Sequence, residues 1–321
     1  MTMTIKAFWK AIKVANASPP DNIIHLKVLY PASIADNQQP LSSAKVPVVI
    51  FFSGINCNLA MYEWLALKLV DRGLVVVLFN WVAENIPGNV SLTPGVNLAA
   101  FSPDVYGTIP SASALPSLLA ELEQLNREGI LANRLDLQKI ILGGHSAGGR
   151  VALENANPQF FEGVVAAFSY GGHTAAPVQV GYDPSTILSL SNSVPMLLMG
   201  GTLDGVIANS SGIYGIDAWE TPATPVIRTF REAISRKEDD SYLVLLEGAN
   251  HFSISDRSDP TLEVAALDYP ATQPETQIRS ILAELVGLFI DLHVSQQSPS
   301  PSQIARFIEA NKSLIAAFEH K

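Results

Sequence analysis

The 321-residue sequence contains a single cysteine, Cys57, so no disulfide can form within the chain. Charged residues make up only 16% of it and carry a formal net charge of −10. Nucleic acid is not an expected partner, because its phosphates would meet a net negative surface. No uninterrupted apolar run approaches the roughly 20 residues that a membrane-spanning helix needs. The first residues show no basic and then apolar leader, and we expect a cytoplasmic protein.

Cofactor motifs are missing as well. The sequence has no His-Glu-x-x-His and no cysteine pair, so it predicts no metal site. Neither Gly-x-x-x-x-Gly-Lys nor Gly-x-Gly-x-x-Gly occurs, so no nucleotide cofactor is implied. What the chain does have is 48% hydrophobic residues, which is enough for a sizeable core.

Short apolar runs alternate with helical patterns along most of the chain. This alternation predicts an α/β fold with a doubly wound, mostly parallel sheet and helices on both faces. An antiparallel strand pair is expected ahead of it, over residues 5–14 and 23–30. The other predicted strands cover residues 46–52, 74–80, 137–142, 161–170, 194–199 and 242–247, and the predicted helices residues 58–71, 114–127, 150–155, 225–236 and 277–294.

We expect one domain over residues 1–295, because an α/β fold of this size can be a single unit. Two insertions rich in apolar and aromatic residues, 81–113 and 205–240, are predicted on its catalytic side, where they shape a pocket or fill a secondary core. Residues 296–321 form a linker and then an amphipathic helix, predicted over 303–318. This helix either docks on the body or joins two copies into a homo-oligomer.

The most informative motif is Gly144-His145-Ser146-Ala147-Gly148, which follows an apolar strand and precedes a helical pattern. Gly-x-Ser-x-Gly is typical of a sharp strand-to-helix turn, the nucleophile elbow, that exposes a serine hydroxyl. The two glycines leave room for that turn, since a Cβ at either position would meet neighbouring backbone. The alternative is a glycine-rich loop with an incidental serine, and the flanking strand and helix weigh against it.

A serine nucleophile needs a base, and the base needs a carboxylate that orients it. In a doubly wound sheet these groups lie on loops at the carboxyl ends of strands. Asp204 follows one buried strand and His251 follows the last predicted one. Asp217 and Glu220 are alternative acids, although they lie well beyond the strand. The order serine, acid, histidine is that of α/β hydrolases.

On these residues, the stretch from about 46 to 292 resembles the α/β-hydrolase superfamily of serine hydrolases. Within it, the chain is similar to the branch that contains chlorophyllases, dienelactone hydrolases and platelet-activating-factor acetylhydrolases. The segments that carry the resemblance are 48–56, 62–77, 144–149 and 250–252.

Three features depart from that branch. Many relatives have His-Gly where this chain has Ser53-Gly54, so the bracing role of that histidine must be met by other groups. Dienelactone hydrolases carry cysteine at the nucleophile position, where this chain has Ser146. Plant chlorophyllases take their acid from the loop after the preceding strand, which here is residues 170–173 and holds no carboxylate.

Two backbone amides are expected to bind the oxyanion. One is that of Ala147, the residue after the nucleophile, and the resemblance implies that the other is that of Ile55. The alternative for Ile55 is an ordinary strand-to-helix turn. We expect His145 to pack beneath or beside the elbow, and Cys57 to be a small buried side chain rather than a reactive thiol. The candidate substrate-binding residues are Asn56, His173 and Phe252.

The sequence therefore predicts a cofactor-independent carboxylesterase that acts on a small-molecule ester with apolar acyl or alcohol groups, through an acyl-enzyme on Ser146. A chlorophyllase-like or lipid esterase is one alternative, and a peptidase or acyltransferase is another. The remaining alternative is a hydrolase fold that only binds and has no activity. The substrate itself is set by loop geometry rather than by a motif.

Overall fold

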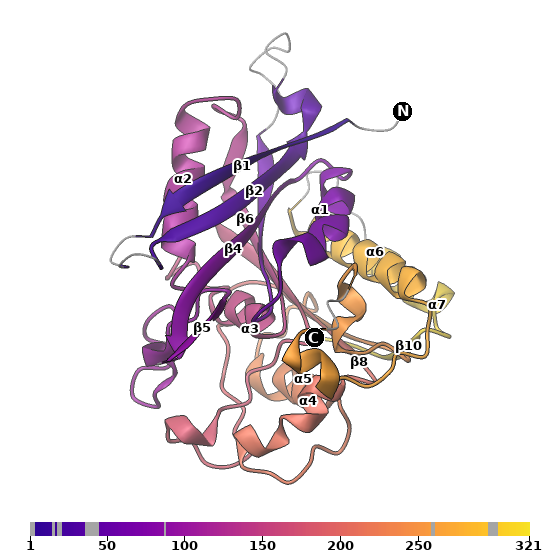
Figure 1. The fold of residues 1–321 in the computed structure, drawn as a ribbon. Coiled ribbons are helices and arrows are strands. Elements are labelled where there is room, and N and C mark those ends of the chain that lie inside the picture. The colour runs from indigo at the N-terminus through magenta and orange to yellow at the C-terminus, as the bar shows by residue number, and fades with distance from the viewer. Residues whose placement is uncertain are drawn as a thin grey trace.

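The computed structural model describes residues 4–14, 17, 21–35, 45–86, 88–257, 261–294 and 301–321. Within these ranges the chain forms a 10-stranded sheet in the order β1-β2-β4-β3-β6-β7-β8-β9-β10, with β5 paired to β4 (Figure 1). The strands are β1 Ile5–Lys13, β2 Ile23–Pro31, β3 Val46–Phe52, β4 Val75–Ile86, β5 Asn89–Leu92, β6 Leu135–His145, β7 Val164–Tyr170, β8 Met196–Gly201, β9 Tyr242–Leu246 and β10 Ile315–His320. The α-helices are α1 Glu63–Val70, α2 Leu115–Arg127, α3 Ala147–Glu154, α4 Gly205–Asn209, α5 Thr224–Arg228, α6 Glu275–Val294 and α7 Pro301–Ala310.

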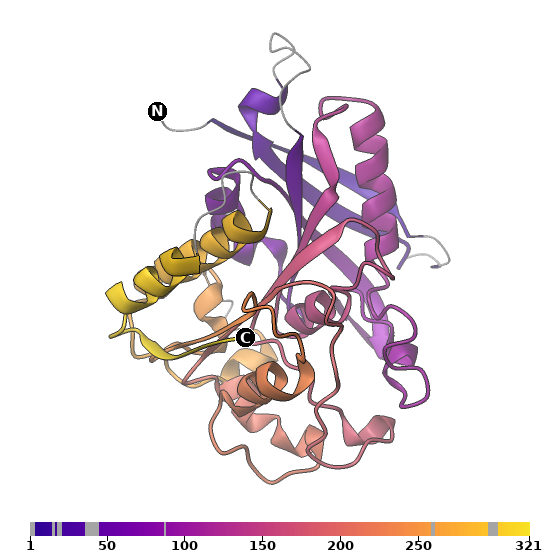
Figure 2. The same cartoon turned by 180° about the vertical axis from the view of Figure 1, so that it is seen from behind.

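The central strands β4, β3, β6, β7, β8 and β9 are parallel, and the antiparallel pair β1–β2 joins them along β4. Helices α2, α3 and α5 share one hydrophobic cluster with one face of the sheet. Helices α1 and α6 share a second cluster with the other face, and the two views show both layers (Figures 1 and 2). Both faces are covered, which is why the central strands are continuous apolar runs. The predicted doubly wound sheet is confirmed.

One predicted strand is longer than its sequence pattern indicated. The strand predicted over 74–80 continues to Ile86 and turns back into β5. Side chains over 81–84 alternate between buried and exposed, which is typical of a strand covered on one face only. Part of the predicted insertion 81–113 is thus a β-hairpin.

The prediction of one helix over 303–318 is wrong in its second half. Helix α7 ends at Ala310, and residues 315–320 form β10, antiparallel to β9. The edge of β9 offers unpaired backbone groups, and pairing with them outweighs the helical spacing of the apolar residues. The ring of Phe318 stacks on that of Tyr242, with centroids 6.2 Å apart. Helix α7 itself docks on the body through the buried Ile304, whereas most of the predicted linker lies outside the described residues.

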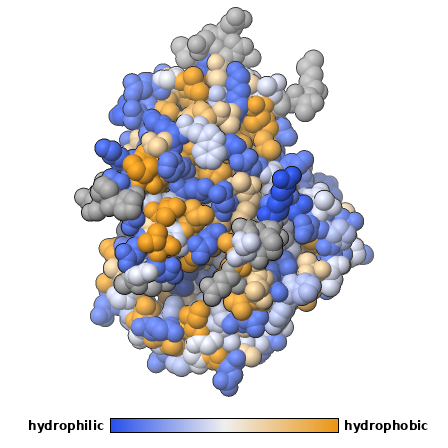
Figure 3. All heavy atoms as spheres, in the orientation of Figure 1, coloured by the Kyte–Doolittle hydropathy of each residue, from blue (hydrophilic) through white to orange (hydrophobic). Residues whose placement is uncertain are grey.

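The surface in Figure 3 mixes polar and apolar side chains, and apolar groups border a hollow in its lower half. No helix in the described ranges is long and apolar enough to cross a membrane.

Candidate active site

Ser146 lies in the turn between β6 and α3 with φ 54° and ψ −125°. A positive φ is strained for a residue with a side chain, and such strain is typical of a nucleophile elbow. The turn is tightly enclosed, because a Cβ on Gly144 would lie 2.3 Å from the carbonyl oxygen of Gly148. A Cβ on Gly148 would lie 2.2 Å from the carbonyl oxygen of Phe52. Only glycine fits at either position.

Asp204 and His251 form a buried pair at the ends of β8 and β9. His251 Nδ1 lies 2.8 Å from Asp204 Oδ2, and the side chains are 4% and 1% exposed. The other carboxylate oxygen of Asp204 accepts a hydrogen bond from the amide of Ile207 at 2.9 Å and thereby caps α4. Because Nδ1 donates to the carboxylate, Nε2 of neutral His251 is the acceptor that can take a proton.

Burial alone would lower the pKa of His251. The charge of Asp204, its hydrogen bond and the charge of Asp268 together outweigh burial and raise this pKa above the ordinary value of an imidazole. The pair therefore stabilises the imidazolium that a general base becomes.

The elbow, the base and the loop after β3 lie close together. The ring of His145 lies 4.6 Å from that of His251, measured between centroids. A Cβ on Gly54 would contact Ser146 Cβ at 3.4 Å, and one on Gly171 would contact His251 at 3.3 Å. Within the described residues, no hydrogen bond joins the Ser146 hydroxyl to His251. In serine hydrolases this contact commonly shortens only when substrate binds.

A buried hydrogen-bond chain braces these three segments. His145 Nε2 lies 3.0 Å from the carbonyl oxygen of His251, so this nitrogen must donate. His145 Nδ1 then accepts from Tyr62 Oη at 2.8 Å, and Tyr62 Oη accepts from the amide of Gly54 at 3.3 Å. Burial, together with the nearby charge of His251, lowers the pKa of His145 well below its usual value and keeps the ring neutral. These hydrogen bonds tie the loop after β3, which has Ser53-Gly54 in place of His-Gly, to the elbow and to the main chain at His251.

Sequence reasoning placed His145 beneath or beside the elbow but missed Tyr62. The available signal was a tyrosine in an otherwise apolar helical pattern, since a buried hydroxyl needs a partner. Its partner is 83 residues away, however, and no local pattern identifies it.

Removing the Tyr62 hydroxyl tests this brace. Tyr62→Phe leaves the Gly54 amide and His145 Nδ1 unpaired in the interior, so we expect a loss of about 1–3 kcal/mol of unfolding free energy. Urea denaturation measures this loss. The matched control is Tyr242→Phe, because the buried Tyr242 hydroxyl has no hydrogen-bond partner among the described residues. Equal losses in both variants would contradict the brace.

Ile55 and Ala147, whose amides are the predicted oxyanion donors, both line a cavity of about 200 Å³. Ile55 is 42% exposed, and its loop is held where the amide of Asn56 donates to the carbonyl of Leu92 at 2.8 Å. Within the described chain, no hydrogen-bond acceptor is paired with the amide of Ile55 or of Ala147. Both are free to bind an oxyanion. The other lining residues are Asn89, Ser91, Val96, Leu98, Phe101, Arg150, Val151, Pro177 and Val180.

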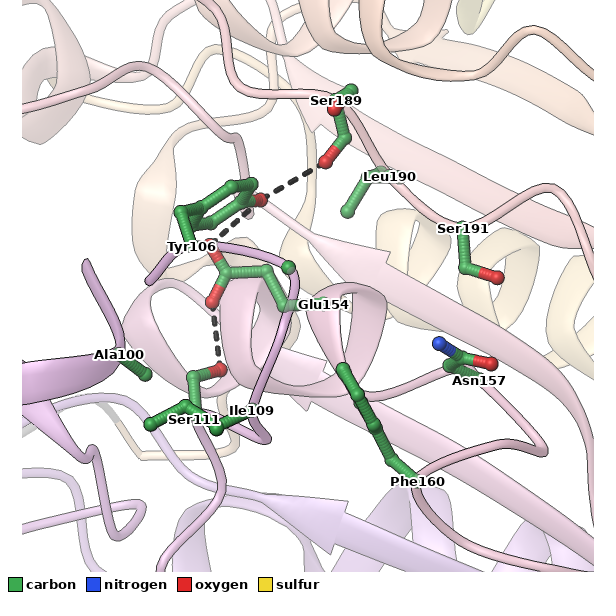
Figure 4. Close-up of a pocket in the computed structure, with 11 residues that line it drawn as sticks. Ala100, Tyr106, Ile109, Ser111, Glu154, Asn157, Phe160, Ser189, Leu190 and Ser191 are labelled. Carbon is green, nitrogen blue, oxygen red and sulfur yellow. Dashed lines mark hydrogen bonds between the residues drawn. The ribbon is translucent and has the colours of Figure 1, made fainter. Parts of the chain in front are cut away.

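Arg150 shapes the wall of this cavity. Its guanidinium lies over the ring of Phe101, 4.5 Å from the centroid, and its Nε donates to Glu154 at 2.7 Å. Glu154 also lines a second cavity, which Figure 4 shows. There Glu154 accepts from Ser111 at 2.8 Å and from Tyr106 at 3.4 Å. With three donors its carboxylate is satisfied, and this second cavity contains none of the predicted site residues.

The three candidate substrate-binding residues lie in different places. Phe252 packs edge-on against His251, with centroids 5.3 Å apart. His173 Nδ1 accepts from the amide of Ala175 at 3.3 Å, and burial lowers the pKa of His173 to about 3, with help from the nearby charges of Arg150 and His251. It is therefore a neutral side chain near the base.

Asn56 lines a separate surface hollow with Met61 and Trp64. Cys57 is buried, and burial raises the pKa of its thiol to about 11, which favours the prediction of an unreactive side chain. The alternative acids Asp217 and Glu220 are exposed, and in the described structure neither is bonded to His251. No cluster of three or more His, Cys, Asp or Glu side chains suited to a metal ion occurs among the described residues.

No protein-family model matches the sequence, and no curated protein matches it. Among solved structures, the chain is similar to a ferulic acid esterase from Streptomyces cinnamoneus, with a TM-score of 0.56 and 16% identity over 94% of each chain. The fold is an α/β-hydrolase fold. At this identity the likeness shows the fold alone and leaves the activity to be argued from the site.

Proposed function

We propose that this protein is a serine hydrolase that cleaves carboxylic esters through an acyl-enzyme on Ser146. Two observations carry the proposal: the strained backbone of Ser146 in the elbow, and the buried Asp204–His251 pair, whose imidazole contacts the ring of His145 in that elbow. The esterase named among similar structures fits this reading. We also propose a cytoplasmic location, which the single, buried cysteine favours.

In the proposed reaction, the Ser146 hydroxyl attacks the ester carbonyl while His251 Nε2 takes its proton. Asp204 holds the imidazole in the required tautomer and stabilises its charge. The amides of Ile55 and Ala147 bind the negative oxygen of the tetrahedral intermediate. His251 then returns the proton to the leaving alcohol. Water, activated by His251, attacks the acyl-enzyme in the same way and releases the acid.

The cavity beside the oxyanion amides suits the acyl group of the substrate. The leaving alcohol must lie next to His251, which protonates it, and His251 does not line this cavity. The acyl group therefore extends the other way, toward Val96, Phe101 and Val180. An apolar cavity of about 150 Å³ holds benzene, so a volume of about 200 Å³ fits an aryl group or a short acyl chain. We propose esters of compact apolar acids as substrates.

A panel of p-nitrophenyl esters tests this proposal together with a variant that narrows the cavity. We expect faster cleavage of butanoyl, hexanoyl and benzoyl esters than of dodecanoyl esters. Val180→Phe is expected to lower kcat/KM for the benzoyl ester by about tenfold, because one or two carbon groups in a pocket have effects of this size. The acetyl ester should be cleaved as before. The matched control is Val90→Phe, since Val90 is exposed and does not line the cavity.

The panel, extended with phytyl esters, peptide amides and alcohol acceptors, separates the alternatives. Preference for phytyl or long-chain esters would favour a chlorophyllase-like or lipid esterase, and preference for amides or for alcohol acceptors would favour a peptidase or acyltransferase. A protein that only binds would not react with a fluorophosphonate at Ser146. Equal effects of Val180→Phe on acetyl and benzoyl esters would contradict the acyl cavity.

A further inference from the structure

A surface segment connects the loops that carry the acid and the base. It spans residues 267–272, beginning at the last residue of a short 3₁₀ helix, and we call it the strap. The side chain of Asn209, at the end of α4, donates to the carbonyl of Leu267 at 2.8 Å. The side chain of Asn250, next to the base, donates to the carbonyl of Tyr269 at 2.7 Å. The strap is thus bonded to both catalytic loops.

The carboxylate of Asp268 is the inward-reaching part of the strap. Its Oδ1 accepts from the amide of Gly205 at 2.8 Å and from the amide of His251 at 3.2 Å. Its Oδ2 accepts from the amide of Phe252 at 3.2 Å. Gly205 directly follows Asp204, so one carboxylate holds the main chain beside the acid and at the base.

The close approach at Gly205 leaves no room for a side chain. A Cβ on Gly205 would lie 2.3 Å from the amide nitrogen of Tyr269 and 2.6 Å from the carbonyl oxygen of Leu267. The strap therefore passes directly over the start of α4. The glycine is required for Asp268 to reach both amides.

We propose that Asp268 is a positioning residue that fixes the two loops relative to each other and so sets the geometry of the Asp204–His251 pair. This inference rests on the proposed function, in which that pair activates Ser146. The two loops end different strands and are joined directly where the amide of Leu203 donates to the carbonyl of Ala249 at 2.9 Å. Asp268 adds charge-assisted hydrogen bonds to both loops, at Gly205 and at His251 itself. A displacement of about 1 Å in such a constellation reduces turnover by about 10²-fold.

Asp268 also acts on His251 through its charge. The titratable groups that face His251 are Asp204 and Asp268, whose charges raise its pKa, and the neutral rings of His145 and His173. Burial raises the pKa of Asp268 itself, against the hydrogen bonds from backbone amides that favour its charged form. Removing this carboxylate should therefore change both the position and the pKa of His251.

The test compares Asp268→Asn with Asp217→Asn in the full-length protein. Asn at 268 keeps one oxygen acceptor but loses the charge and the second acceptor. Asp217 is exposed, so its variant removes the same charge away from the strap. We expect D268N to lower kcat about 10- to 100-fold at unchanged KM, and to lower the pKa of His251 in a histidine NMR titration. D217N should leave both unchanged.

A folded D268N with wild-type kcat and an unshifted His251 pKa would overturn the proposal. So would a loss of activity that only follows a loss of folded protein. If D268N does not fold, D268E is the deciding variant, because it retains the charge and displaces the carboxylate. We then expect kcat to fall while the pKa of His251 stays close to that of the wild type. An unchanged kcat in D268E would overturn the proposal. The NMR titration needs no substrate, so it measures the effect of Asp268 on the pKa of His251 even if the wild type cleaves no ester. A wild type that cleaves no ester would refute the proposed function and not this effect.

Discussion

Replacing Ser146 with alanine is expected to reduce kcat for ester hydrolysis by at least about 10⁴-fold, because removal of the nucleophile from a serine hydrolase leaves only binding and oxyanion stabilisation. The change deletes one oxygen at the elbow and no hydrogen bond among the described residues, so thermal stability should stay near that of the wild type. Initial rates with p-nitrophenyl butanoate, measured on protein purified without a contaminating host esterase, give the comparison.

The matched control is Ser169→Ala. Ser169 is a fully buried serine on β7 whose hydroxyl has no partner among the described residues, so its removal should leave activity intact. Labelling by a fluorophosphonate should be lost in S146A and kept in S169A. Wild-type turnover in S146A would refute the nucleophile, and a wild type that neither turns over esters nor takes the label would favour a protein that only binds.

The sheet and the meeting of its strand ends could be predicted because both depend on local signals. A strand covered on two faces must be apolar throughout, and β3 and β8 show this directly in their sequence. Parallel strands then bring their carboxyl ends to one edge. That step alone placed Asp204 near His251, and the structure puts the two side chains 2.8 Å apart.

The features that sequence reasoning missed depend on contacts between distant segments. Strand β10 forms because β9 has a free edge, which no periodicity within 303–318 reports. Tyr62 bonds to the ring of His145, which is 83 residues away in the sequence. Asp268 accepts from the amide of Gly205, which is 63 residues away. Hydrogen bonds of this kind satisfy buried groups only after the fold has formed, so their residues look ordinary in the sequence.

The same site geometry predicts how activity depends on pH and on Asp204. In the proposed mechanism His251 acts as a base only when it is neutral, and its pKa is raised above that of an ordinary imidazole. The kcat/KM of the wild type should therefore increase with pH, with a midpoint above the usual imidazole value. In Asp204→Asn the stabilising charge is gone, so the pKa of His251 falls and the midpoint moves to lower pH.

The loss of rate should nevertheless be large in Asp204→Asn, about 10⁴-fold in kcat at the optimum, because an amide can hold the imidazole in the wrong tautomer. Asn is also a good N-cap, so the bond to the amide of Ile207 that begins α4 can persist and stability should change little. This combination separates a catalytic acid from a residue that only supports the fold. The comparison variant is Asp217→Asn, because Asp217 is the alternative acid. If D217N loses activity and D204N keeps it, the assignment of Asp204 as the carboxylate that orients His251 is wrong.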